Sequence, residues 1–85
     1  MKKLVRYDQL EVGDVIRFHG AREIVMGVSN YGESKTYPGE SVIRFDLAPY
    51  DNEAEEMLGS FYSRGSYGGV GFIEVELVER IGAEQ

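Results

Sequence analysis

Four glycines lie close together in the segment RGSYGGVGF, which covers residues 64–72. A glycine-rich segment holds a phosphate when it follows a strand and opens a helix with the spacing G-x-G-x-x-G, or when it ends in Gly-Lys-Ser/Thr. Here the third glycine is missing, a strand-like run follows Gly71, and no lysine occurs after Lys35. The spacing therefore favours a turn between two strands, in which glycine supplies positive φ. We expect this turn to present Tyr67 to solvent at its tip.

The other reactive side chains form no catalytic pattern. His19 is the single histidine, and a Ser-His-Asp arrangement with Asp14 or Asp46 would need a geometry that sequence spacing does not supply. The acidic run 51–56 is superficially similar to a calcium loop, but it has no glycine at the sixth position and Tyr62 in place of the acid at the twelfth. Acidic residues in a first helical turn stabilise the helix dipole, which accounts for this run. We therefore expect no enzyme activity, no cofactor and no metal site.

Tyrosine is the residue type that points to recognition. Four tyrosines fall in predicted loops, whereas the phenylalanines at 18, 45 and 61 fall at strand positions. Loop tyrosines near Ser, Gly and Asn offer rigid contact area at small entropic cost, as binding surfaces do. They would otherwise fold back to cover the open ends of a small core, and both interpretations stay open. The predicted partner-binding residues are Tyr31, Tyr37, Tyr50, Arg64 and Tyr67.

Composition restricts the class of protein and of partner. Nine basic and fifteen acidic side chains leave a net charge of −6, which disfavours nucleic acid because phosphate binding depends on Lys and Arg. The chain has no cysteine, so disulfides and thiolate metal sites are excluded and a reducing compartment is favoured. No apolar run follows the basic start, and none approaches the ~20 residues of a membrane span. We expect a soluble, cytoplasmic protein that does not contact membranes.

The elements that position these residues are strands, since the dominant hydrophobic period is two. In the run 14–19, Ile16 and Phe18 alternate with polar side chains, and Gly20-Ala21 fits a type II′ hairpin turn with glycine first. The chain is then expected to return with Ile24, Met26 and Val28 on the inner face. The polar segment 29–41 predicts a long loop.

Two further strands and one helix follow. The run 41–47 places Ile43, Phe45 and Leu47 on one face, and Pro49 ends it. Asn52 is a candidate cap for a short helix near residues 52–58. The clearest long strand is 72–79, in which the apolar residues Ile73, Val75 and Leu77 alternate with glutamates. Those glutamates are expected to be solvated or to lie opposite arginines, and this strand could serve as an edge that pairs between two copies in a homodimer.

Five or so short antiparallel strands with one helical turn predict a mainly β protein. Residues 1–85 form one small domain, and closing its sheet into a small barrel would remove exposed edges. The stretch LEVGDVIRF, followed by IVMGV, resembles the opening of SH3-like small β-barrels of the KOW and Tudor type. It is also similar to the G-D-x-I-x-F strand of PUA-like ASCH domains, although their upstream G-x-K-x-x-E-x-R pattern is missing. Either resemblance covers about the first third of the chain and implies a barrel.

Three functions follow as hypotheses. The first is a non-enzymatic module that recognises a protein partner through the loop tyrosines and arginines. The second is binding of a single-stranded nucleic acid or nucleotide on a barrel face, through Arg17, Arg44, Tyr62 and Arg64. The third is an acidic mimic of nucleic acid, with its charge supplied by Glu53, Glu55, Glu56, Glu74, Glu76 and Glu79.

Overall fold

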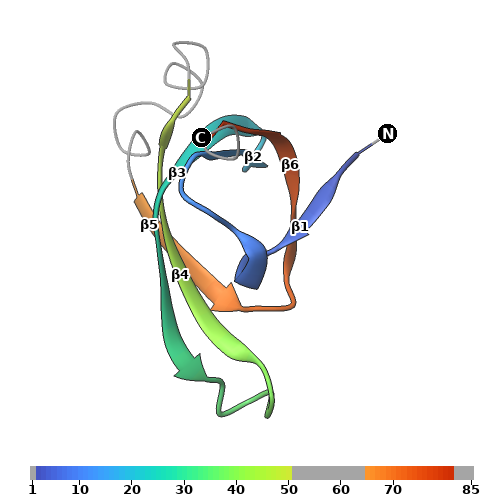
Figure 1. The fold of residues 1–85 in the computed structure, drawn as a ribbon, viewed down its shortest axis with the longest axis vertical. Helices are drawn as coiled ribbons and strands as arrows, with labels where there is room; N and C mark the ends of the chain where they lie inside the picture. Colours follow the sequence, from blue (N-terminus) through green and yellow to red (C-terminus); the bar gives the residue numbers. More distant parts are fainter. Residues whose placement is uncertain (1, 51–64, 82–85) are drawn as a thin grey trace.

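A computed structural model describes residues 2–50 and 65–81 of the chain. These residues are mainly β, as predicted, and form one antiparallel sheet of six strands in the order β1-β6-β2-β3-β4-β5 (Figure 1). A short 3-10 helix, η1 (Tyr7–Gln9), follows the first strand. The strands are β1 (Leu4–Arg6), β2 (Asp14–Phe18), β3 (Ala21–Glu33), β4 (Ser41–Pro49), β5 (Gly65–Val70) and β6 (Glu74–Arg80).

The sheet curls around a common interior but its strand ladder stays open in the described residues. β1 and β5 are its two ends, and each pairs with one neighbour, so the barrel closure predicted from the sequence is not found. η1 lies on the open side, where the Tyr7 N–H donates to the carbonyl oxygen of Ile73 at 2.8 Å and the Asp8 N–H to that of Gly71 at 3.2 Å. The predicted helix near residues 52–58 lies outside the described residues.

The core is built from the strands whose alternation was clearest in the sequence. Ile43, Phe45 and Leu47 of β4 are almost completely buried, as predicted. Val75 and Leu77 of β6 join the same core. They do so because side chains alternate across a strand, so one face of each curled strand turns inward.

The β2–β3 turn differs from the prediction by one residue. His19 and Gly20 are its central residues, and both have positive φ, of 52° and 83°. Two positive φ values define a type I′ turn, whose twist matches the flanking strands. The predicted type II′ turn at Gly20-Ala21 is therefore wrong, and Ala21 instead opens β3 opposite Phe18.

The first half of β3 buries the face opposite to the one predicted. Glu23 and Val25 are buried, whereas Met26 is 55% exposed. Glu23 shares its face with Ile16 across the β2 ladder, and that register turns it inward. A register shift between Val25 and Gly27 then changes the phase, so that Val28 packs against the core as predicted.

Two expected boundaries also move. β3 continues to Glu33, so the predicted 29–41 loop shortens to the residues between β3 and β4. β6 pairs with β1 on one side and β2 on the other, so it is a central strand and not the predicted edge. Glu76 of β6 lies opposite Arg17 and 3.6 Å from its Nε, which confirms that glutamates of this strand face arginines.

Most of the glycine cluster is strand β5, and of its four glycines only Gly71 lies in the turn that leads to β6. Residues 65–70 pair with β4, and no glycine from 65 to 71 has a positive φ. Gly68 is required for close approach, because a Cβ there would lie 2.8 Å from the carbonyl oxygen of Ile43. Glycine in a strand interior often marks such a contact between backbones.

Replacing Gly68 with alanine is expected to lower the free energy of unfolding by about 1–3 kcal/mol, because the Ile43 carbonyl can yield only if β4 and β5 part. Gly27→Ala is the matched control, since its Cβ would meet Asp46 Oδ2 at 3.1 Å, the movable end of a side chain. Urea denaturation measures both. Equal losses in the two variants would contradict this role for Gly68.

Candidate protein-binding face

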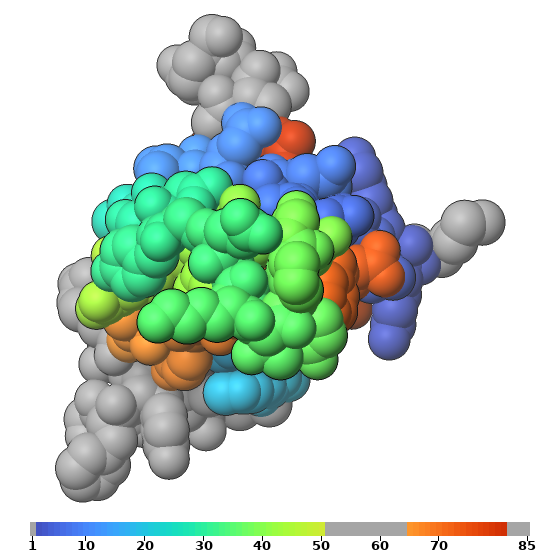
Figure 2. All heavy atoms as spheres, turned by 90° about the horizontal axis from the view of Figure 1, so that it is seen from below, coloured from blue at the N-terminus to red at the C-terminus, as the bar shows by residue number. Residues whose placement is uncertain are grey.

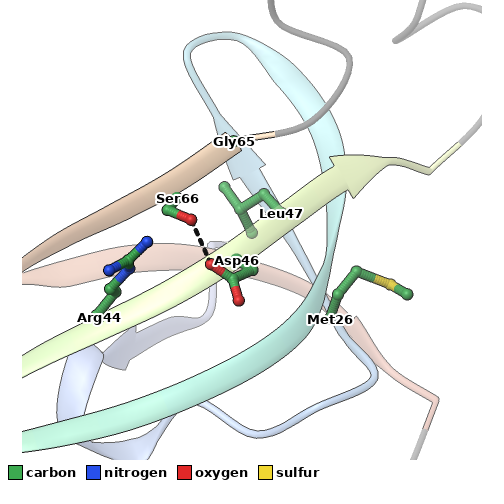
Figure 3. Close-up of a pocket in the computed structure, with 6 residues that line it drawn as sticks. All are labelled: Met26, Arg44, Asp46, Leu47, Gly65 and Ser66. Carbon is green, nitrogen blue, oxygen red and sulfur yellow. Dashed lines mark hydrogen bonds between the residues drawn. The ribbon is translucent and has the colours of Figure 1, made fainter.

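The outward side of β4 and β5 carries exposed side chains of both charges together with polar and apolar groups. Figure 3 shows Arg44 and Asp46 on β4 with Ser66 on the neighbouring strand. The ladder partners of Arg44 and Asp46 on β5 are Gly68 and Ser66. Because Gly68 has no side chain, the surface beside Arg44 is hollowed. We call this surface the β4–β5 face, and it comprises Met26, Tyr31, Val42, Arg44, Asp46, Ser66 and Gly68.

Two hollows meet on this face at Arg44 and Ser66. One, of about 420 Å³, lies toward the end of β4 and is lined by Met26, Asp46, Leu47 and Gly65. The other, of about 300 Å³, is lined by Tyr31, Val42, Ile43, Tyr67, Gly68 and Gly69. Met26 is 55% exposed and Tyr31 is 62% exposed, so each hollow has a large accessible side chain at its rim.

The two charges of the face are each held by a neutral hydroxyl. Arg44 Nη1 donates to the Tyr31 hydroxyl at 3.1 Å, and Ser66 Oγ donates to Asp46 Oδ1 at 2.5 Å. The hydrogen bond to Tyr31, together with the nearby charge of Asp46, raises the pKa of the Arg44 guanidinium. Within the described residues neither Arg44 nor Asp46 forms an ion pair.

Other arginines of the sheet contrast with Arg44. Arg6 contacts Asp8 and Glu40, and Arg80 contacts Asp14 at 2.7 Å. These arginines connect elements of the fold through carboxylates. Among residues 2–50 and 65–81, Arg44 has no carboxylate partner of this kind.

The predicted tyrosines do not converge on one surface. Tyr31 belongs to the β4–β5 face. Tyr37 lies in the β3–β4 loop and meets Phe72 edge-on, with ring centroids 5.0 Å apart; this loop and the turn after β5 lie together at the end of the molecule seen in Figure 2. Arg64 lies outside the described residues.

The remaining two tyrosines pack on the protein itself. Tyr67 lies on β5, not in a loop, and packs against the core beside Phe18 and Phe45, at centroid distances of 4.7 and 6.4 Å. Tyr50 follows β4, and its hydroxyl donates to Glu79 of β6 at 3.2 Å. The packing of Tyr67 agrees with the alternative that some tyrosines cover the core, whereas Tyr50 is 36% exposed.

Among the described residues of the two other hypotheses, the arginines lie on separate strands, whereas the glutamates at 74, 76 and 79 lie together on β6. Arg17 projects from β2 and pairs with Glu76, so it does not add to the charge of Arg44 on β4. Glu79 is engaged by Tyr50. Tyr62 and the glutamates at 53, 55 and 56 lie outside the described residues.

Sequence reasoning missed five members of the face, namely Met26, Val42, Asp46, Ser66 and Gly68. Asp46 and Arg44 are the outward positions between the inward residues of β4, and that alternation was the available signal. Ser66 and Met26 had no comparable signal, because β5 was taken as a turn and β3 was assigned the wrong face.

No protein-family model matches the chain, and no curated protein is similar to it. Across residues 2–50 and 65–81, no three His, Cys, Asp or Glu side chains gather as a metal site would require. The described segments also contain no helix with the length and apolar character needed to cross a membrane.

Proposed function

We propose that this protein is a non-enzymatic binding module that recognises a protein partner through the β4–β5 face. The observation that carries the proposal is the pair of opposite charges, Arg44 and Asp46, each of which is held by a hydroxyl and forms no ion pair within the described residues, beside two adjoining hollows. Protein interfaces combine such polar groups with large exposed anchors, and Tyr and Arg are the residue types most often found at their energetic centre.

The arrangement suits a protein surface better than a small molecule. The hollows are shallow and adjoin one another, so they accept side chains from a broad partner and do not enclose a ligand. Met26 and Tyr31 stand at opposite ends and supply apolar contact area around the charges. We include in the proposal an SH3-like type of small barrel, which the curled sheet and the position of η1 on its open side support.

A site-specific cross-linking experiment tests the function. A photoreactive phenylalanine analogue at Met26 is expected to cross-link a protein, whereas the same analogue at Val12 is not. Val12 is the matched control, because it is 59% exposed and Met26 is 55% exposed, yet Val12 lies outside the face. Mass spectrometry of the adducts identifies the protein.

The charge of the face is tested in the same assay. Adding Arg44→Asp to the Met26 probe is expected to reduce the adduct at least about tenfold, because reversing a charge places like charges together across the interface. Equal adducts from the Met26 and Val12 probes, or adducts indifferent to Arg44→Asp, would contradict protein recognition by this face.

A further inference from the structure

We propose that the partner of the β4–β5 face is a second copy of this chain, packed face to face about a two-fold axis that crosses β4 between Arg44 and Asp46. The inference rests on the proposed function and names its partner. It does not involve pairing through β6, which is central in the sheet.

The charge pattern of the face is complementary to itself. Arg44 and Asp46 are two positions apart on the outward side of one strand, so their side chains follow one another along β4. A two-fold axis between them reverses the strand direction in the second copy. Arg44 then faces Asp46 of the second copy, and Asp46 faces Arg44 of the second copy. This reciprocity is what an interface with two-fold symmetry requires.

The hollows and the large side chains of the face are also complementary about this axis. Tyr31 contacts Arg44 from one end of the charged pair, and Met26 lies beside Asp46 and Leu47 at the other end. The two-fold operation places Tyr31 over the second copy's hollow beside Leu47 and Gly65. The same operation places Met26 over the other hollow of the second copy, the one that Val42 lines. Each hollow of one copy therefore receives a large side chain of the other copy, so that all four hollows of the dimer are filled.

The hydroxyl contacts prepare the charges for this arrangement. Tyr31 holds Arg44 and Ser66 holds Asp46, so both side chains are oriented before association. Ordering a long side chain in advance reduces the entropic cost of binding. The anchors Met26 and Tyr31 supply apolar area, while the reciprocal charges select the register and exclude a parallel arrangement of the two β4 strands.

Sedimentation velocity of wild type and two charge variants tests the dimer. The wild type is expected to be dimeric at about 100 μM, where a dimer with Kd below about 10 μM is mostly formed. Arg44→Asp leaves two acids on the face, and Asp46→Arg leaves two arginines. Each variant alone is expected to be monomeric, because the two-fold axis then places like charges together.

An equimolar mixture of the two variants is the decisive measurement. The acidic face of one complements the basic face of the other, so the mixture is expected to recover the dimer. The double variant Arg44→Asp/Asp46→Arg restores self-complementarity and is expected to dimerise by itself. Recovery of the dimer by the mixture and by the double variant would show that positions 44 and 46 face each other across the interface. Circular dichroism melts check that the variants are folded. Arg17→Glu reverses a charge outside the face and is expected to stay dimeric, so it is the matched control.

Two outcomes overturn the inference and separate it from the proposed function. If the wild type is monomeric and the Met26 probe forms a specific adduct with another protein, the dimer is contradicted but protein recognition by the face is supported. If the wild type is monomeric and the Met26 probe forms no specific adduct, both the dimer and protein recognition by the face are contradicted. Dimerisation of both single variants as strong as that of wild type would also contradict the proposed axis.

Discussion

Replacing Arg80 with methionine is expected to lower the free energy of unfolding by about 3 kcal/mol, because it leaves the carboxylate of Asp14 buried without its counter-charge. Asp14 is fully buried. Its Oδ1 accepts Arg80 Nε at 2.7 Å, and its Oδ2 accepts Arg80 Nη2 at 3.0 Å and the Glu11 N–H at 2.9 Å. The pair joins the start of β2 to the end of β6, where Asp14 and Arg80 are ladder partners.

The expected loss lies at the low end for breaking a buried pair, because Arg80 is partly exposed and water reaches Asp14 once it is removed. Arg17→Met is the matched control. Its contact with Glu76, at 3.6 Å, is more exposed and is expected to contribute less than about 1 kcal/mol. Adding Asp14→Asn to Arg80→Met removes the unpaired charge and should recover most of the stability. Chemical denaturation measures the free energy of unfolding of the wild type and the three variants. Equal losses for Arg80→Met and Arg17→Met would contradict this account.

Replacing Glu23 with methionine is expected to raise the free energy of unfolding at pH 7 by about 1–3 kcal/mol, because it removes a buried polar group that lacks a partner. Glu23 is only 1% exposed, and its Oε1 has no hydrogen-bond partner. It lies between Ile16 of β2 and Pro49 of β4 in the two ladders. A methionine has a similar length and no group to desolvate.

The same side chain makes stability depend on pH. Burial raises the pKa of the Glu23 carboxyl above its ordinary value of 4.5. The folded state therefore binds a proton more readily than the unfolded state. Stability falls as pH rises from about 4.5 through the higher pKa of the folded state, and it is restored when the pH is lowered again.

Glu23→Gln isolates this dependence, because it keeps the shape and removes the titration. Thermal or urea unfolding across this pH range is expected to give a smaller decline for Glu23→Gln than for wild type, with the other carboxyls common to both. Glu74→Gln, at an exposed position of β6, is the control and should change the profile little. Identical profiles for wild type and Glu23→Gln would contradict the burial of this carboxyl.

The candidate face could be predicted only in part. Tyr31 was identified from its residue type, whereas Arg44 was named only for the nucleic-acid hypothesis. Asp46 and Ser66 could not be placed beside them, since their contact joins β4 to β5 across a separation of twenty residues. Tyr67 was assigned to a solvent-exposed turn because glycines suggested positive φ, whereas those glycines allow two strands to approach closely.

Local patterns were sufficient for the β class, the existence of a β2–β3 hairpin, the inward residues of β4, and Val75 and Leu77 of β6. Ile73, predicted on the same face, instead precedes β6 and is 37% exposed. The local patterns were sufficient because a two-residue alternation with one clearly apolar face has a single inward solution. Tertiary structure alone decided which face of β3 is buried, that β6 is central, and which ion pairs form among the described residues. Both faces of β3 carry apolar residues, so its inward face depends on its register with β2 and β4, and strand register is a property of pairs of strands and not of one strand's sequence.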